Sequence, residues 1–275
     1  MLRTILLATG GIIAVAVAWI AFSIWTFSHS IDAEFAALEA SAKPNAEVVS
    51  EERVAQLPPP VARHLRQAGV VGQKIPTLVH ITQTGRMRSA PDAGWMDFQA
   101  VETYSTNPPG FVWRADFPSR ALPVLFGRDH YIDGDGRITM KLLGTLAVAD
   151  IGGSTDLNTA ALMRFLNEAM WFPAALAGSN LVYTPIDDDT VEVTLADHGL
   201  SATARLYFDA DGKIVNFSAK RLNLDANSIQ TWQTPVGGYE TFNGITVASG
   251  GQAVWQTPDG PFAYIELKVT SIAQE

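Results

Sequence analysis

The pattern of hydrophobic and polar positions divides the chain into one uninterrupted apolar segment and a much longer region in which the two kinds of residue alternate. Residues 5–27, ILLATGGIIAVAVAWIAFSIWTF, carry no charged side chain. A helix of this length reaches about 34 Å and would cross the hydrocarbon layer of a membrane, which is about 30 Å thick. We therefore predict a transmembrane anchor over residues 1–30.

The charges beside the apolar segment predict its direction across the membrane. Arg3 precedes it, whereas three acidic residues follow it before the first lysine, Lys43. Because basic residues favour the cytoplasmic side, we expect a membrane protein with its N-terminus in the cytoplasm and its C-terminal domain outside. The alternative is a cleaved signal peptide, since residues 14–16 read Ala-Val-Ala, although the apolar run continues well beyond them.

Between the anchor and the alternating region we predict a stem and a helical lead-in. The stem occupies residues 31–50 and contains a short helix over residues 32–42. A further helix begins at residue 51, and consecutive prolines separate it from another helix over residues 61–68. We assign residues 51–275 to a single domain, because neither half of this region has its own set of helices.

From residue 77 onward the hydrophobic period is two, which is the period of β-strands. In residues 136–149, for example, Ile138, Met140 and Leu142 share one face. Asp-Gly and Asn-Gly pairs separate several of these runs, as in hairpins, so we expect antiparallel pairing. We predict about eleven strands, over residues 77–88, 95–104, 111–117, 122–132, 136–149, 190–196, 200–208, 213–221, 227–234, 244–256 and 261–272.

One amphipathic helix, over residues 156–171, interrupts the series of strands. The predicted fold class is therefore α+β, with an N-terminal transmembrane helix followed by a large curved antiparallel sheet, a half-barrel, covered by a few helices. A sheet of this width curls, and so few helices cover only part of its concave face. That arrangement favours a cavity for an apolar or amphipathic ligand. The alternative is a core that its own side chains fill.

Four segments carry a resemblance to a known family. They are residues 57–69 (LPPPVARHLRQAG), 108–117 (PPGFVWRADF), 129–136 (DHYIDGDG) and 162–173 (LMRFLNEAMWFP). These segments resemble an uncharacterised bacterial family of single-pass membrane proteins. The order of the elements is also similar to that of the lipoprotein-carrier superfamily, the periplasmic LolA-type half-barrels. The resemblance implies a fold and a location, the bacterial inner (cytoplasmic) membrane, rather than a chemistry.

Composition excludes several classes of function. The chain has no cysteine, so it has no thiolate metal site and no catalytic thiol. Its formal net charge of −9 argues against a nucleic acid partner. The histidines lack the spacing of metal ligands, and the common motifs of hydrolases and nucleotide-binding enzymes are missing. We therefore expect no metal and no cofactor, and we assign no catalytic residue.

The densest polar group on an apolar element lies in the helix over residues 156–171. Arg164, Glu168 and Trp171 are spaced so that they share one stripe of this helix. As a ligand site, Glu168 would meet the polar head of a ligand, Arg164 would bind a carboxylate or phosphate, and Trp171 would line the cavity. The alternative is an ordinary ion pair with a core tryptophan beside it.

Three further residues on strands are candidates for ligand binding. Arg86 lies on a polar strand face, which is either exposed to solvent or a strip across the cavity mouth. Trp113 is a candidate for the cavity wall. His130 precedes a hairpin turn and would serve as an acid or base if it faced the cavity, but it would be a surface residue otherwise.

Together these features predict a membrane-anchored extracytoplasmic protein that holds a lipid or other hydrophobic molecule in a half-barrel cavity. One alternative is an enzyme that uses Glu168 or His130 as acid or base in the same cavity. Another is a structural protein of envelope assembly that binds a partner protein through a sheet edge or an apolar patch.

Overall fold

The computed structural model describes residues 2–119 and 122–275. Its first half contains an N-terminal helical part and six strands: α1 (Leu2–Ser41), α2 (Glu51–Ala55), α3 (Pro59–Ala68), β1 (Leu78–Met87), β2 (Met96–Thr106), β3 (Pro109–Ser119), β4 (Leu122–Ile132), β5 (Asp135–Leu142) and β6 (Leu146–Gly152). The second half continues with α4 (Thr155–Glu168), the 3₁₀ helices η1 (Ala169–Trp171) and η2 (Pro173–Ala177), β7 (Leu181–Pro185), β8 (Thr190–Asp197), β9 (Leu200–Phe208), β10 (Ile214–Asn223), β11 (Ser228–Gln233), β12 (Val236–Phe242), β13 (Ile245–Thr257) and β14 (Gly260–Gln274).

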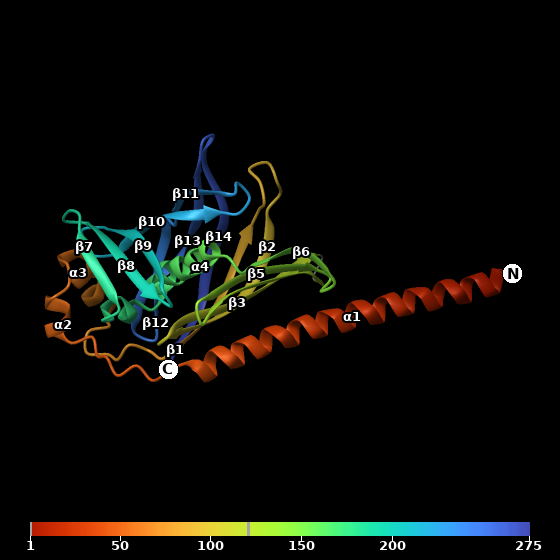
Figure 1. The fold of residues 1–275 in the computed structure, drawn as a ribbon, viewed down its shortest axis with the longest axis horizontal. Helices are drawn as coiled ribbons and strands as arrows, with labels where there is room; N and C mark the ends of the chain where they lie inside the picture. Colours follow the sequence, from red (N-terminus) through yellow and green to blue (C-terminus); the bar gives the residue numbers. More distant parts are fainter. Residues whose placement is uncertain (1, 120–121) are drawn as a thin grey trace.

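In this described part of the chain the strands form one sheet of fourteen, in the order β6-β5-β4-β3-β2-β1-β14-β13-β11-β10-β9-β8-β7, with β12 beside β13. Neighbouring strands pair antiparallel throughout the sheet. Figure 1 shows the sheet curling around α4, which contacts strands from both halves of it. The predicted fold class, a curved antiparallel half-barrel covered by a few helices, is confirmed.

The strand count is fourteen rather than about eleven, for two reasons. The run over residues 136–149 is a hairpin of β5 and β6 instead of one strand. Its turn uses Leu143 and Gly144, which have φ angles of 52° and 67° and lack the Asp-Gly or Asn-Gly signal. β7 and β12 were not predicted, because β7 is short and ends in proline while two glycines interrupt the alternation in β12.

The predicted helices form where their capping signals lie. Ser50 accepts a hydrogen bond from the Arg53 amide at the start of α2, and Ser154 accepts one from the Leu157 amide at the start of α4. Gly69 ends α3 with a φ of 79°, a left-handed conformation that glycine adopts without strain. The helix expected over residues 156–171 is confirmed as α4 and η1.

α1 is one continuous helix in which the apolar segment and the helix expected over residues 32–42 are joined. Its last turns pack on the convex face of the sheet. There Phe27, Ile31 and Leu38 form a small core with Val112 of β3 and Phe126 of β4. The N-terminal part of the helix projects away from the sheet (Figure 1).

A buried ion pair also holds α1 on this face. Glu34 pairs with Arg128 and accepts a hydrogen bond from His130 Nδ1 over 3.0 Å. Burial raises the pKa of Glu34, but the hydrogen bond with His130 and the charge of Arg128 lower it by more, so its pKa lies below the ordinary value. The carboxylate is therefore ionised at neutral pH and binds both basic side chains.

We predict that Ile31→Ala lowers the free energy of unfolding by roughly 2–5 kcal/mol, because Ile31 is buried between α1 and the sheet and its truncation leaves a cavity. The measurement is urea unfolding of the full chain in detergent, followed by tryptophan fluorescence. Val17→Ala is the matched control, since Val17 lies on the exposed part of α1. Equal stabilities of the two variants would show that α1 is not docked.

Candidate functional site

The sheet and α4 leave a cavity of about 380 Å³ between them. Its wall is mainly apolar and comes from both halves of the sheet and from the end of α4, with Met87, Phe98, Met140, Trp171, Trp232 and Ile265 among the lining residues. Four charged or polar side chains that belong to one hydrogen-bonded network interrupt this wall: Gln83, Asp129, Arg164 and Glu168. The cavity is thus amphipathic, with a charged patch on an apolar surface.

Arg164 is the centre of the charged patch. Its guanidinium donates to Glu102 Oε1 from Nη2 over 2.8 Å, to Asp129 Oδ2 from Nη1 over 2.7 Å, and to Glu168 Oε1 from Nε over 2.8 Å. The Glu102 side chain is completely buried and that of Arg164 is 14% exposed. One cation on α4 therefore binds carboxylates from β2, β4 and α4 itself.

Neutral polar groups complete the network behind Arg164. Tyr104 donates to Glu168 Oε2 over 3.1 Å, and Gln83 donates to Glu102 Oε2 over 3.1 Å. Trp113 in turn donates to Gln83 over 3.3 Å. Both oxygens of Glu168 are thereby engaged within the network, which favours a role in binding and positioning over acid–base catalysis.

The aromatic side chains of β3 also hold the Arg164 cation. Its guanidinium carbon lies 4.8 Å from the centre of the Phe111 ring and 5.2 Å from that of Trp113. Such cation–π contacts are strongest where water is excluded, as on this wall. Arg221 is placed similarly over Trp232, at 4.5 Å, and its guanidinium also faces the cavity.

Three carboxylates face two guanidinium groups on this wall, so the group would carry net negative charge if every member were ionised. Burial, together with the charges of Glu168 and Asp129, raises the pKa of Glu102 well above its ordinary value despite Arg164. Burial also raises the pKa of Glu168 and of Asp129. Burial thus favours the protonated form of these carboxyl groups more than an exposed site would, and the rise in pKa is greatest for Glu102.

The structure brings four of the six predicted binding residues together on the cavity wall: Trp113, Arg164, Glu168 and Trp171. Arg164 and Glu168 form the ion pair expected from their spacing, at 2.8 Å. This pair belongs to a larger buried network and is not an isolated surface contact. Trp171 lies in η1 beside Tyr104, with ring centres 6.5 Å apart.

Arg86 lies on the outer, solvent-exposed face of β1 and does not line the cavity. It pairs with Glu266 of β14 at 2.7 Å, and its guanidinium carbon lies 4.8 Å from the centre of the Trp95 ring. Gln83, three residues earlier, points to the concave face instead. Of the two possibilities for the Arg86 face, the structure shows the solvated one.

His130 also lies on the convex face, where it contacts Glu34 of α1. Its neighbour in sequence, Asp129, points into the cavity. Adjacent residues of a strand point to opposite faces, so only one of the two can line the cavity. His130 therefore contributes to holding α1, and the cavity group from this segment is Asp129.

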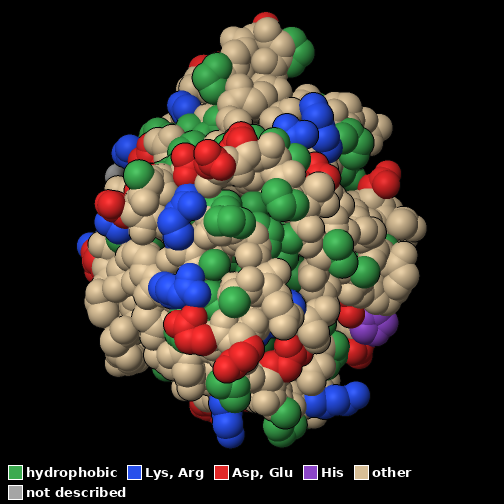
Figure 2. All heavy atoms as spheres, turned by 90° about the vertical axis from the view of Figure 1, so that its left-hand side faces the viewer, with side chains coloured by type: hydrophobic (Ala, Val, Ile, Leu, Met, Phe, Trp, Pro, Cys, Tyr) green, Lys and Arg blue, Asp and Glu red, His purple; other side chains and the backbone are tan. Residues whose placement is uncertain are grey.

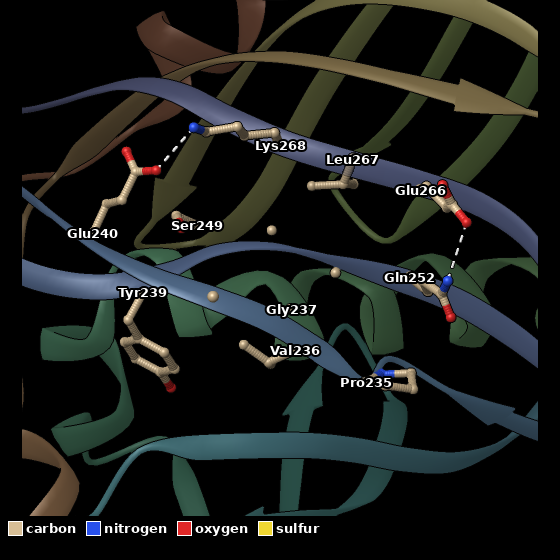
Figure 3. A pocket seen from close by; sticks show the side chains of 13 residues that line it. Pro235, Val236, Gly237, Tyr239, Glu240, Ser249, Gln252, Glu266, Leu267 and Lys268 are labelled. Atoms are coloured by element: carbon tan, nitrogen blue, oxygen red, sulfur yellow. Dashed lines mark hydrogen bonds and ion pairs between the residues drawn. The ribbon is translucent and has the colours of Figure 1, made fainter.

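A second depression lies on the outer side of the sheet over β12, β13 and β14 (Figure 3). Its volume is about 650 Å³, and α4 lies behind the strands in this view. Ion pairs flank it, including Lys268 with Glu240 at 2.9 Å. Gly237, Gly238 and Gly250 are among its lining residues, and Ser249 is the buried polar residue among those that line it.

The members of the network that sequence reasoning missed are Glu102, Tyr104 and Gln83. Each is buried on the concave face of β1 or β2, where its neighbours on the same face are mostly apolar. The available signal was the alternation itself, because Glu102 and Tyr104 fall two apart on β2 and therefore share a face with buried aromatic residues. Within the described part of the chain no group of three or more acidic or histidine side chains is arranged to hold a metal ion.

Comparison with known proteins gives the family. A model of DUF6544, a family of unknown function, matches residues 47–267, and the chain belongs to this family. The membership in an uncharacterised family expected from the sequence is thereby confirmed. No curated protein matches the chain.

Solved structures show similarity in fold at low sequence identity. A LolA superfamily protein from Nitrosomonas europaea is 11% identical, with a TM-score of 0.45, and the match covers 77% of this chain and 91% of that one. A DUF1329 family protein from Desulfovibrio piger is 10% identical, with a TM-score of 0.44 and coverage of 80% and 94%. A domain of an outer membrane lipoprotein-sorting protein from Vibrio parahaemolyticus, described as putative, is 8% identical, with a TM-score of 0.40 and coverage of 72% and 85%. The LolA superfamily, which the order of elements in the sequence resembles, is therefore among the structural matches.

We predict that Glu102→Gln changes how stability depends on pH. A carboxyl whose pKa is higher in the folded state binds a proton on folding, so the free energy of unfolding falls as the pH rises from the ordinary value of 4.5 to the raised value. Glu102→Gln removes this loss, so its stability relative to wild type increases with pH across that window, by up to about 1.4 kcal/mol per pH unit.

The measurement is urea unfolding of both proteins at several pH values. Taking the difference between them cancels the opposite contribution of His64, whose pKa burial lowers to about 4. A difference that does not vary with pH would show that Glu102 has the same pKa in the folded and unfolded chains.

Proposed function

We propose that this protein is a membrane-anchored extracytoplasmic binding protein that holds a lipid or other hydrophobic molecule in its half-barrel cavity. The observation that carries the proposal is the amphipathic cavity, an apolar space of about 380 Å³ with one charged wall. This volume is within the range of small-molecule sites, about 300–1,000 Å³. The wall chemistry matches an amphipathic ligand, whose chain would lie on the apolar surface and whose head would face Arg164 and its carboxylates.

The network around Arg164 supports a binding role in a second way. Its charged groups are fixed by mutual hydrogen bonds before any ligand arrives, so they need little reorganisation on binding. The cavity wall presents the carboxylates of Asp129 and Glu168 as acceptors beside the guanidinium donor of Arg164. A polar head with hydroxyl or amide groups therefore suits this wall.

The apolar part of α1 supports the membrane location. α1 is the one helix, within the described residues, that is long and apolar enough to cross a membrane, and its most apolar stretch is not buried against the domain. Trp25 is exposed near the end of the apolar segment, where tryptophan favours the membrane interface. We place the N-terminus in the cytoplasm and the sheet on the outer side of a bacterial inner membrane.

We predict that Ala149→Trp reduces the amount of lipid bound per molecule several-fold, because Ala149 of β6 lines the cavity and an indole there would occupy ligand space. The protein is purified in mild detergent, and organic extracts are analysed by mass spectrometry. Ala147→Trp is the matched control, since Ala147 is exposed on the same strand and pairs with Lys141 of the convex face.

The expected result is that Ala149→Trp carries several-fold less lipid than wild type, whereas Ala147→Trp carries as much as wild type. A wild-type protein that carries no lipid, and binds no fluorescent fatty acid when one is added, would contradict the proposed function.

A further inference from the structure

The hairpin of β5 and β6 has two unlike faces. On its convex face Arg137 pairs with Asp150 at 2.7 Å, and Lys141 lies with its ammonium 4.5 Å from the centre of the Phe27 ring of α1. On its concave face the cross-strand pairs are apolar: Ile138 with Ile151, Met140 with Ala149, and Leu142 with Leu146. We call these six residues the apolar hairpin face.

The apolar hairpin face runs from inside the cavity to the tip of the hairpin. Its first two pairs line the cavity, and the third lies at the turn. Leu146 is 62% exposed, so the face continues beyond the cavity into open surroundings. No polar side chain interrupts it along that length.

The tip of the same hairpin touches α1 where the apolar segment ends. Gly144 packs so closely on the helix that a Cβ atom there would lie 2.7 Å from the backbone of Ile24. Ile24 is near the end of the apolar run over residues 5–27 and next to Trp25. A membrane crossed by α1 would therefore have its outer interface at the level of the hairpin tip.

We propose that the apolar hairpin face is the path by which the acyl chain of a membrane lipid passes between the bilayer and the cavity, with the hairpin tip resting in the outer membrane interface. This inference rests on the proposed function and names the source of the ligand, the lipids of the membrane that anchors the protein. The occupant is an acyl chain because the face is wholly apolar and ends at the hairpin tip, where Gly144 contacts Ile24 near the end of the apolar part of α1.

The position of β6 in the sheet favours the same occupant. β6 is an edge strand, and both Leu146 and Val148 are largely exposed on it. An apolar edge strand open to water promotes aggregation unless something covers it. Contact with the membrane covers this edge and leaves its convex side bound to α1.

The opposite edge of the sheet provides a control position. β7 forms that edge, and its Val182 is 66% exposed, close to the exposure of Leu146. Figure 2 shows the molecule from the end of Figure 1 where α2, α3 and β7 lie. Acidic and basic side chains are interspersed there with small groups of apolar ones. Val182 is therefore equally apolar and exposed, but remote from α1.

The first experiment uses the absence of cysteine from the chain. Leu146→Cys and Val182→Cys are each labelled with an environment-sensitive dye, and the full chain is reconstituted into phosphatidylcholine vesicles that contain nitroxide-labelled lipid. We expect the dye at residue 146 to shift to the blue and to be quenched at least twofold more than the dye at residue 182. Equal quenching at the two positions overturns the proposal.

The second experiment measures lipid transfer. Vesicles containing a fluorescent phospholipid donate it to the reconstituted full chain, with wild type compared against Leu142→Asp/Leu146→Asp and against the control Val182→Asp. We expect the uptake rate to fall at least tenfold in the double variant only, while lipid offered in detergent micelles fills the cavity of all three equally. Loss of micelle loading in the double variant alone would assign the defect to the cavity and overturn the path.

The two proposals fail in different ways. If wild type takes up no lipid from either vesicles or micelles, the proposed function fails and the path fails with it. If wild type takes up lipid and the double variant does so at the same rate, only the path is overturned.

Discussion

The burial of one guanidinium group, that of Arg164, is the interaction on which the arrangement of this molecule depends. It ties α4 to β2 and β4 through Glu102 and Asp129, and so fixes the helix within the curl of the sheet. A buried pair of this kind adds little net stability, because desolvation offsets much of the attraction, but removing one partner costs about 3–5 kcal/mol. Its effect is therefore on position: α4 is held at one wall, and the space beside it stays open.

The same alternation of strand residues that builds this wall also separates the two tasks of the sheet. On β4, Asp129 faces the cavity whereas Arg128 and His130 face α1. On β5, Met140 lines the cavity whereas Lys141 contacts Phe27 of α1. Each strand on this side thus contributes its concave residues to the ligand space and its convex residues to the docking of the helix. A single-residue shift in register would exchange the two sets.

This alternation also explains how much could be predicted from the sequence. The period of two and the paired turn residues predict the curved sheet, and the amphipathic pattern of residues 156–171 predicts its inserted helix. The spacing of Arg164, Glu168 and Trp171 places them on one stripe, and all three line the cavity. These features are local, so the residues that determine them lie close together in the chain.

What could not be predicted depends on contacts between distant segments. Asp129 and His130 are equally polar and adjacent, and the choice of face follows from the register of β4 with β3 rather than from either residue. Glu102 pairs with Arg164, which is 62 residues away in the sequence, and Glu34 pairs with Arg128, which is 94 residues away. The continuity of α1 through its apolar and polar parts likewise depends on the sheet surface against which its last turns pack.

Because α1 is docked on the sheet, the anchor in the proposed function would also set the orientation of the domain relative to the membrane. A flexible stem would let the domain move freely above the membrane, whereas a continuous helix packed by Phe27, Ile31 and Leu38 gives the sheet one orientation. In that orientation the β5–β6 hairpin and the end of the apolar part of α1 lie side by side, since Gly144 contacts Ile24. The ion pair of Glu34 with Arg128 and His130 thus helps to fix the position of α1 on the sheet, on which the proposed path depends, although it lies on the convex face and lines no part of that path. A ligand held by Arg164 and its carboxylates would be drawn from the membrane to which the protein is fixed.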